Sequence, residues 1–109
     1  MTQTLKVLGQ SALAATTLTD VYTVPSSTST TVSSVVICNA AGTATTFRLS
    51  IAVAGAADTA KQYLYYDTSL AANDTFIATI GVTLAATDIL RAYAGNANLS
   101  VTVYGVEIS

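Results

Sequence analysis

The chain has 109 residues, which is enough for one domain around a single core and too few for two ordinary domains. Charged residues make up only 9% of it, against about 25% in ordinary soluble domains, and hydrophobic residues make up 51%. With four Lys and Arg residues and a net charge of −2, the sequence lacks the cationic face that nucleic-acid binding requires. It also has no histidine, which removes the commonest metal ligand and the commonest general base.

Alternation of apolar and polar residues predicts an all-β chain. Phe47, Leu49 and Ile51, for example, alternate with Arg48 and Ser50, as in a strand with one buried face. Short segments containing Gly, Asn and Asp separate the runs and are typical of turns. In chain order, the expected strands lie near residues 4–8, 18–24, 31–39, 45–54, 61–67, 74–80, 87–94 and 98–107.

About eight strands at this spacing predict a single antiparallel β-sandwich domain over residues 1–109. Its strand topology is either jelly-roll or immunoglobulin-like. Both remain open because strand order is set by long-range pairing, which the local sequence pattern does not encode. Residues 1–10 are expected to be an extended N-terminal arm or an edge strand. The Ala-rich residues 11–17 lack an apolar stripe and are expected to be extended rather than helical.

One short motif, Leu-Ala-Ala-x-Asp, occurs twice, at residues 70–74 and 84–88. Each copy precedes an apolar strand. A duplicated binding site would be one interpretation of this repeat. We favour a recurring connection between strands, in which the leucine anchors one strand end and the aspartate caps the following turn.

The sequence offers little for catalysis or metal binding. The single cysteine, Cys38, lies in an apolar run and is expected to be a small buried hydrophobic residue. The aspartates are spread over separate turns, where carboxylates usually cap backbone amides; the ones considered as a catalytic pair are Asp58, Asp67, Asp74 and Asp88. We therefore predict a non-enzymatic protein with no catalytic residues, no metal site and no cofactor.

The low charge bears on partners and location. A surface of Thr, Ser, Asn, Gln and Ala loses little hydration energy when another protein covers it, so we predict packing against other subunits, including a homo-oligomer. A monomer with an unusually mild surface is the alternative. No stretch sustains the roughly 20 apolar residues of a membrane span, and the N-terminus lacks the order of a signal peptide. We expect no membrane or nucleic-acid partner.

The main aromatic feature is Tyr63-Leu64-Tyr65-Tyr66. Strand alternation places Tyr63 and Tyr65 on one face and Tyr66 on the other with Leu64. The three tyrosines are the candidate interface residues, since amphipathic rings can anchor a protein contact or stack on a sugar. The other interpretation is that one face belongs to the core and the other covers it. The lack of Trp makes a sugar site the weaker interpretation.

Six segments resemble small virion structural proteins of tailed phages, including phages of cyanobacteria. They are Leu5-Lys6-Val7-Leu8-Gly9-Gln10, Asp20-Val21-Tyr22-Thr23-Val24-Pro25, Val36-Ile37-Cys38-Asn39, Lys61-Gln62-Tyr63-Leu64-Tyr65-Tyr66, Asn73-Asp74-Thr75-Phe76 and Tyr104-Gly105-Val106-Glu107-Ile108. The resemblance spans most of the chain and consists of strand and turn patterns, so it carries over no catalytic residue.

The resemblance implies a β-sandwich or jelly roll located in the virion and assembled in the host cytoplasm. It implies a capsid decoration or cement protein that binds the major capsid protein or other virion proteins, as a homo-oligomer such as a trimer. The alternative that it implies is a tail, baseplate or fibre module that binds a host surface glycan. Tyr63, Tyr65 and Tyr66 would be the first residues to examine in such a module.

Overall fold

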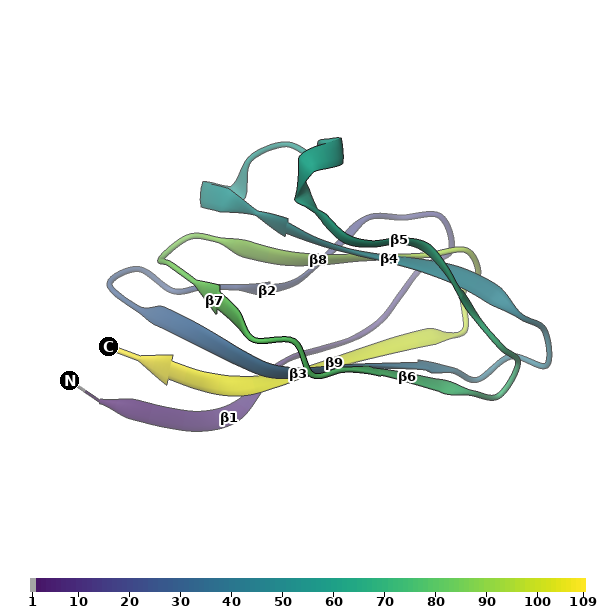
Figure 1. Cartoon of the computed structure of the whole chain (residues 1–109), viewed down its shortest axis with the longest axis horizontal. Coiled ribbons are helices and arrows are strands. Elements are labelled where there is room, and N and C mark those ends of the chain that lie inside the picture. Colours follow the sequence, from purple (N-terminus) through teal and green to yellow (C-terminus); the bar gives the residue numbers. More distant parts are fainter. Residues whose placement is uncertain (1) are drawn as a thin grey trace.

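A computed structural model describes residues 2–109, which form two packed β-sheets (Figure 1). Two single turns of 3-10 helix interrupt the strands. In chain order the elements are β1 (Gln3–Ala12), β2 (Thr19–Thr23), β3 (Ser29–Asn39), β4 (Thr45–Ala52), η1 (Val53–Gly55), η2 (Ala60–Gln62), β5 (Tyr63–Leu70), β6 (Thr75–Ala78), β7 (Val82–Leu84), β8 (Ile89–Ala94) and β9 (Leu99–Ile108).

The predicted antiparallel β-sandwich is confirmed. One sheet has the order β1-β9-β3-β6, with β7 also paired to β3, and the other has the order β2-β8-β4-β5. Because β6 and β7 pair with different halves of β3, they act as one interrupted strand. Counted in this way, successive strands lie in opposite sheets, except that β4 and β5 pair within the second sheet, and the first strand pairs with the last. This is the order of a jelly roll, one of the two wirings that the sequence left open.

The predicted strands correspond to eight of the observed ones, with differences at their ends. The strand expected near residues 61–67 begins two residues later, because Lys61 and Gln62 belong to η2, and it extends to Leu70. β7 was not predicted. It has only three residues, which is too short for an alternating pattern to be recognised. Across residues 2–109 no helix has the length and apolar character needed to span a membrane.

The core lies between the sheets and follows from alternation along the strands. In β9, Leu99, Val101 and Val103 are buried, while Ser100 and Tyr104 are exposed. Full burial of an aliphatic side chain of this size contributes about 1.5–3 kcal/mol. The largest fully buried side chains are Phe47, Leu13, Ile37, Leu49, Leu84, Leu90, Leu99, Val24, Val32, Val35, Val101 and Val103.

β1 forms an edge of its sheet and pairs with β9 alone. Its register shifts by one residue between Val7 and Gly9. A Cβ atom at Gly9 would collide with the carbonyl of Val21 in β2, so glycine allows the first two strands to approach closely at this corner of the sandwich. The chain ends meet beside this edge, where Thr2 and Ser109 exchange two backbone hydrogen bonds of 2.7 and 3.0 Å (Figure 1).

The two Leu-Ala-Ala-x-Asp copies form equivalent connections, as the structural interpretation predicted. The leucine of each copy is buried. The fourth residue of each copy has positive φ, 53° at Asn73 and 70° at Thr87. Its N–H donates to a carbonyl outside the motif, from Asn73 to Ala41 and from Thr87 to Val24, at 3.0 Å in both cases. The repeat therefore fixes chain reversals at two places in the fold.

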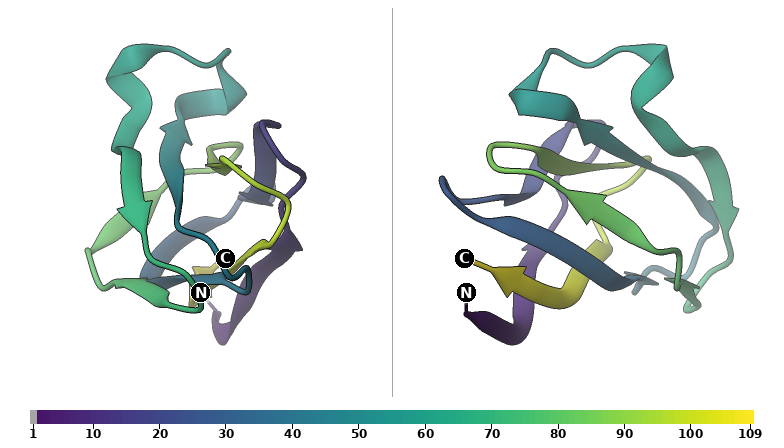
Figure 2. Two further views of the ribbon diagram at one scale, coloured as in Figure 1. Left: turned by 90° about the vertical axis from the view of Figure 1, so that its right-hand side faces the viewer. Right: turned by 60° about the vertical axis from the view of Figure 1, so that its left-hand side comes forward.

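The segment 53–62, with η1 and η2, is the largest excursion from the two layers. It joins β4 to β5 and projects beyond the second sheet in both views of Figure 2. This excursion carries part of the candidate site described below.

Candidate functional site

The two outer faces of the sandwich differ in charge. On the outward side of the first sheet, four adjacent rows of register partners contain no Asp, Glu, Lys or Arg. We call this surface the neutral face. Its residues are Leu5, Val7, Gln10 and Ala12 of β1, Ser100, Thr102, Tyr104 and Val106 of β9, Thr31, Ser34, Val36 and Cys38 of β3, and Thr75 and Ile77 of β6.

Several apolar side chains on the neutral face are exposed. Leu5 is 78% exposed, Ile77 60%, Val7 52% and Tyr104 38%. Cys38 also lies here, half-buried, so the expectation that it is a buried core residue was wrong. Its neighbours Ile37 and Asn39 point into the sandwich, and alternation turns Cys38 outward.

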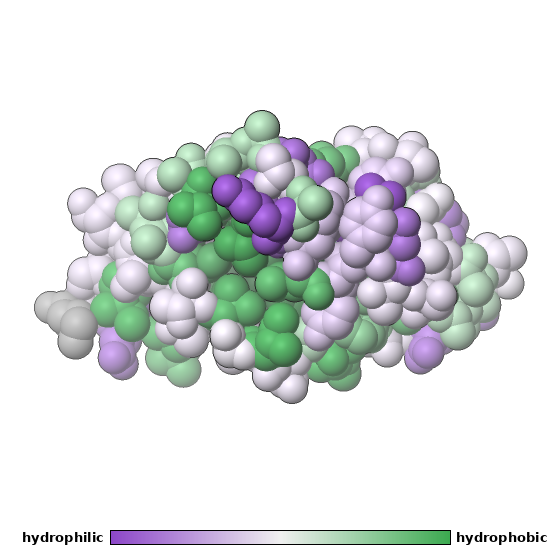
Figure 3. All heavy atoms as spheres, turned by 45° about the horizontal axis from the view of Figure 1, so that its top comes forward, coloured by the Kyte–Doolittle hydropathy of each residue, from purple (hydrophilic) through white to green (hydrophobic). Residues whose placement is uncertain are grey.

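The outer face of the second sheet, by contrast, holds ion pairs and aromatic rings. Arg91 of β8 pairs with Asp20 of β2, and Arg48 of β4 pairs with Asp67 of β5. Even so, strongly hydrophilic residues are few and scattered on the side shown in Figure 3, and most of that surface is weakly polar or apolar.

In the structure, Tyr63, Tyr65 and Tyr66 are not distributed over the two faces of the sheet as strand alternation predicted. The rings of Tyr63 and Tyr66 meet edge to face, with centroids 4.7 Å apart. Tyr65 packs against the core, and its ring centroid lies 5.0 Å from that of Phe76. The prediction that Tyr63 shares a face with Tyr65 and not with Tyr66 was therefore wrong.

Bulges in β5 explain this correction. The β4–β5 register shifts between Phe47 and Leu49 and again between Leu49 and Ser50, so β5 has an extra residue at each shift. Asp67, next to Tyr66, has φ of 47°. Each extra residue breaks the alternation of side chains and re-aims those beside it. The order of apolar and aromatic residues in the sequence does not predict where such bulges occur.

Arg48 holds the exposed ring of Tyr66 in place. Its guanidinium lies 4.3 Å from the ring centroid of Tyr66 and 4.4 Å from that of Tyr93. The same group donates two hydrogen bonds to Asp67, of 2.6 and 3.3 Å, and this ion pair raises the pKa of Arg48 above its ordinary value. Sequence analysis missed Arg48 and Tyr93, whose contact depends on the β4–β8 register.

A pocket of about 430 Å³ opens beside these rings and is lined by Asp58, Thr59, Ala60, Tyr63 and Tyr66. The hydroxyl of Tyr63 donates a 2.6 Å hydrogen bond to Asp58, and this bond raises the pKa of Tyr63. The hydrogen bond holds the side chains of Tyr63 and Asp58, which both line the pocket, next to each other. We call the group of Asp58, Tyr63 and Tyr66 the aromatic corner.

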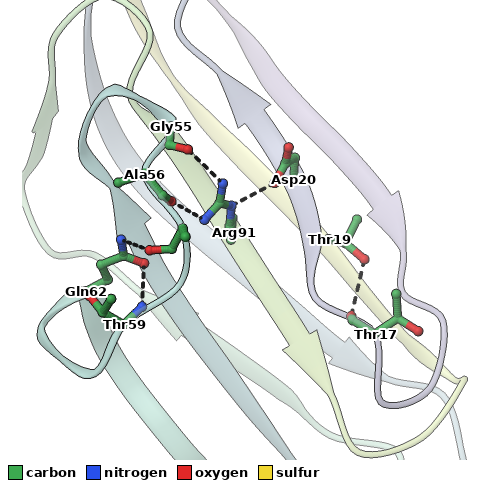
Figure 4. Close-up of polar contacts among 9 residues, drawn as sticks. Thr17, Thr19, Asp20, Gly55, Ala56, Thr59, Gln62 and Arg91 are labelled. Atoms are coloured by element: carbon green, nitrogen blue, oxygen red, sulfur yellow. Dashed lines mark hydrogen bonds and ion pairs between the residues drawn. The ribbon is translucent and has the colours of Figure 1, made fainter.

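The part of segment 53–62 that precedes the pocket lining is held by hydrogen bonds (Figure 4). Arg91 donates to the carbonyls of Ala56 at 2.7 Å and Gly55 at 3.4 Å while it is paired with Asp20. Further along the segment, Gln62 donates to the carbonyl of Ala57 at 2.9 Å. Segment 53–62 is thus tied to β2 and β8 and keeps a defined shape.

The four aspartates that sequence analysis considered occupy separate places. Asp58 bonds to Tyr63, Asp67 pairs with Arg48, and Asp74 and Asp88 accept hydrogen bonds from backbone N–H groups. Within residues 2–109, no three His, Cys, Asp or Glu side chains lie close enough to hold a metal ion.

No model of a known protein family matches this chain. No curated protein matches it either.

Proposed function

We propose that this chain is a structural protein of a phage particle, a decoration or cement protein that binds the assembled shell and stabilises it. The observation that carries the proposal is the neutral face, where exposed Leu5, Val7 and Ile77 lie among uncharged neighbours. The proposed partners are the major capsid protein or other virion proteins, together with further copies of this chain.

The neutral face suits burial for energetic reasons. Removing a charged group from water costs several kcal/mol unless it is paired, and none is present among the side chains of this face. Covering exposed aliphatic groups stabilises the contact by about 25 cal/mol per Å² of apolar surface buried. Contact through this surface therefore meets little opposition and has a hydrophobic driving force.

The neutral face is also large enough for a stable contact. Its central strand β9 and edge strand β1 have ten residues each, a length of about 33 Å. Four strands spaced about 4.8 Å apart give a projected area of roughly 600 Å². A standard interface buries about 800 Å² of accessible surface on each partner, so this face comes close to that size.

A cement role follows from selective binding. A protein that binds the assembled lattice and not free subunits adds its binding free energy to the stability of the shell. Repetition over many copies then makes modest single contacts sufficient. Such a role requires binding but no catalytic activity.

Quantitative mass spectrometry of gradient-purified particles tests the proposal. We expect the chain at high copy number, close to that of the capsid subunit; the low copy number of a tail component would contradict a shell position. The variant Ile77→Lys, which places a charge on the neutral face, should lower occupancy at least about tenfold. Val53→Lys is the matched control, because Val53 is similarly exposed (67%) but lies on the 53–62 segment.

Absence of the chain from purified particles would contradict the proposal. Equal occupancy of the Ile77→Lys and Val53→Lys variants would also contradict it, because binding would then not use the neutral face.

A further inference from the structure

The aromatic corner lies on the other side of the molecule from the neutral face, because Tyr63 and Tyr66 belong to β5 at the edge of the second sheet. An assembly contact through the first sheet therefore leaves it open. Several contacts hold this exposed corner: Arg48 and Tyr63 pack on the ring of Tyr66, and Tyr63 donates to Asp58. A role for the corner would therefore be separate from a contact through the neutral face.

We propose that the aromatic corner is a binding site for a neutral saccharide. Its volume of about 430 Å³ falls within the range of small-ligand sites, about 300–1,000 Å³. The apolar C–H face of a pyranose ring packs on an aromatic side chain, and its hydroxyl groups need hydrogen-bond acceptors nearby. The corner supplies both kinds of group.

Tyr66 provides the stacking surface. More than half of its surface, 57%, is exposed, although its ring is held by Arg48 and by the edge-to-face contact with Tyr63. A ring already fixed in position loses little conformational freedom when a ligand packs on it. The ring of Tyr66 is restrained by these two contacts.

Asp58 provides the acceptor. One of its carboxylate oxygens, Oδ2, receives the hydroxyl of Tyr63, and no hydrogen bond to Oδ1 occurs within residues 2–109. A sugar hydroxyl can donate to this oxygen, and a hydrogen bond to a charged acceptor contributes about 1.5–3 kcal/mol. The Tyr63 hydroxyl oxygen, which already donates to Asp58, can in turn accept from a second sugar hydroxyl.

Charge selects a neutral ligand over an acidic one. The pocket lining contains one carboxylate, Asp58, and no cation. The nearby guanidinium of Arg48 is engaged by Asp67 and lies against the ring of Tyr66. An anionic sugar would therefore be repelled by Asp58, the charged residue of the pocket lining.

Saturation-transfer NMR with the full chain tests this site. The probes are the free monosaccharides glucose, galactose, mannose and N-acetylglucosamine, with N-acetylneuraminic acid as the acidic probe. We expect transfer to the C–H protons of at least one neutral sugar and none to the acidic one. Tyr66→Ala should weaken binding at least tenfold, and Asp58→Asn should weaken it less. Tyr66→Trp, which keeps a stacking ring, should retain binding.

The matched control is Tyr104→Ala, which removes another exposed tyrosine from the neutral face and should leave sugar binding unchanged. Circular dichroism establishes that each variant is folded. The proposal is overturned if no neutral sugar binds, if the acidic sugar binds as well as the neutral ones, or if Tyr66→Ala and Tyr104→Ala bind equally. None of these outcomes affects the result of the particle-binding experiment with Ile77→Lys. The proposed particle binding and the proposed saccharide site can therefore be contradicted independently.

Discussion

The hydroxyl of Tyr22 donates a 2.6 Å hydrogen bond to the carboxylate of Glu107, which joins β2 of one sheet to β9 of the other. The same hydroxyl lies 2.8 Å from that of Thr30, and Lys6 pairs with Glu107 at 3.0 Å. Four residues from four different strands thus form one polar network between the sheets. Because Tyr22 is nearly buried, this network should contribute measurably to stability and to its pH dependence.

Stability is expected to fall at both ends of the pH range. The hydrogen bond from Tyr22 lowers the pKa of Glu107, so its contribution is present above the ordinary Glu pKa and is lost as pH falls through the lower folded value. Burial, followed by the bond to Glu107, raises the pKa of Tyr22 to about 12. That contribution is present below the ordinary Tyr pKa and is lost as pH rises towards about 12.

Urea unfolding of Tyr22→Phe across this pH range measures the effect. At neutral pH the variant should lose about 1.5–3 kcal/mol, and its acid and alkaline losses should both be smaller than those of the wild type. Tyr104→Phe is the control, since Tyr104 is exposed and outside the network. Equal pH profiles for wild type and Tyr22→Phe would rule out this origin of the pH dependence.

Ser50→Ala should stabilise the fold. Ser50 is 1% exposed, and its hydroxyl has no hydrogen-bond partner within residues 2–109. A buried hydroxyl without a partner costs about 1–3 kcal/mol, which removal of the oxygen recovers in part. Thermal and urea unfolding should show a gain of about 1 kcal/mol. A loss of stability would mean that the hydroxyl is satisfied in solution.

Gly105→Ala should destabilise the first sheet. A Cβ atom at Gly105 would collide with the backbone carbonyl of Thr31 in β3, and a strand backbone cannot move aside as a flexible side chain can. Overpacking of this kind costs about 1–3 kcal/mol. Gly81→Ala is the matched change, because no heavy atom lies within 4 Å of the new methyl group. It should be neutral or slightly stabilising, so similar losses in both variants would contradict the argument.

The two motif aspartates should differ in importance although their sequences match. Asp88 is 8% exposed and accepts 2.9 Å hydrogen bonds from the N–H groups of Ala54 and Ala85. Asp74 is exposed and accepts one from Thr75. Asp88→Ala should cost about 1–3 kcal/mol, and Asp74→Ala under about 1 kcal/mol.

Hydrogen exchange distinguishes the local consequence of Asp88→Ala. Since Asp88 holds Ala54 at the start of segment 53–62, its loss should increase exchange there more than in β9. A uniform increase over the whole chain would instead indicate global destabilisation without a specific role in the segment.

The sequence by itself determined the strands and the low charge. Alternation such as that of Leu99, Val101 and Val103 with polar neighbours is a local property, because successive side chains of a strand point to opposite faces. It therefore located eight strands and most of the core. It also identified the Leu-Ala-Ala-x-Asp repeat as a recurring connection between strands.

Only the tertiary structure decided how the strands combine and which side chains meet. The jelly-roll order depends on pairings such as β1 with β9, whose residues are about a hundred positions apart, and no local pattern encodes them. The bulges in β5 brought Tyr63 to Tyr66 and sent Tyr65 to the core. The neutral face and the aromatic corner likewise exist only in the folded chain, because each gathers residues from strands that are distant in sequence and adjacent in space.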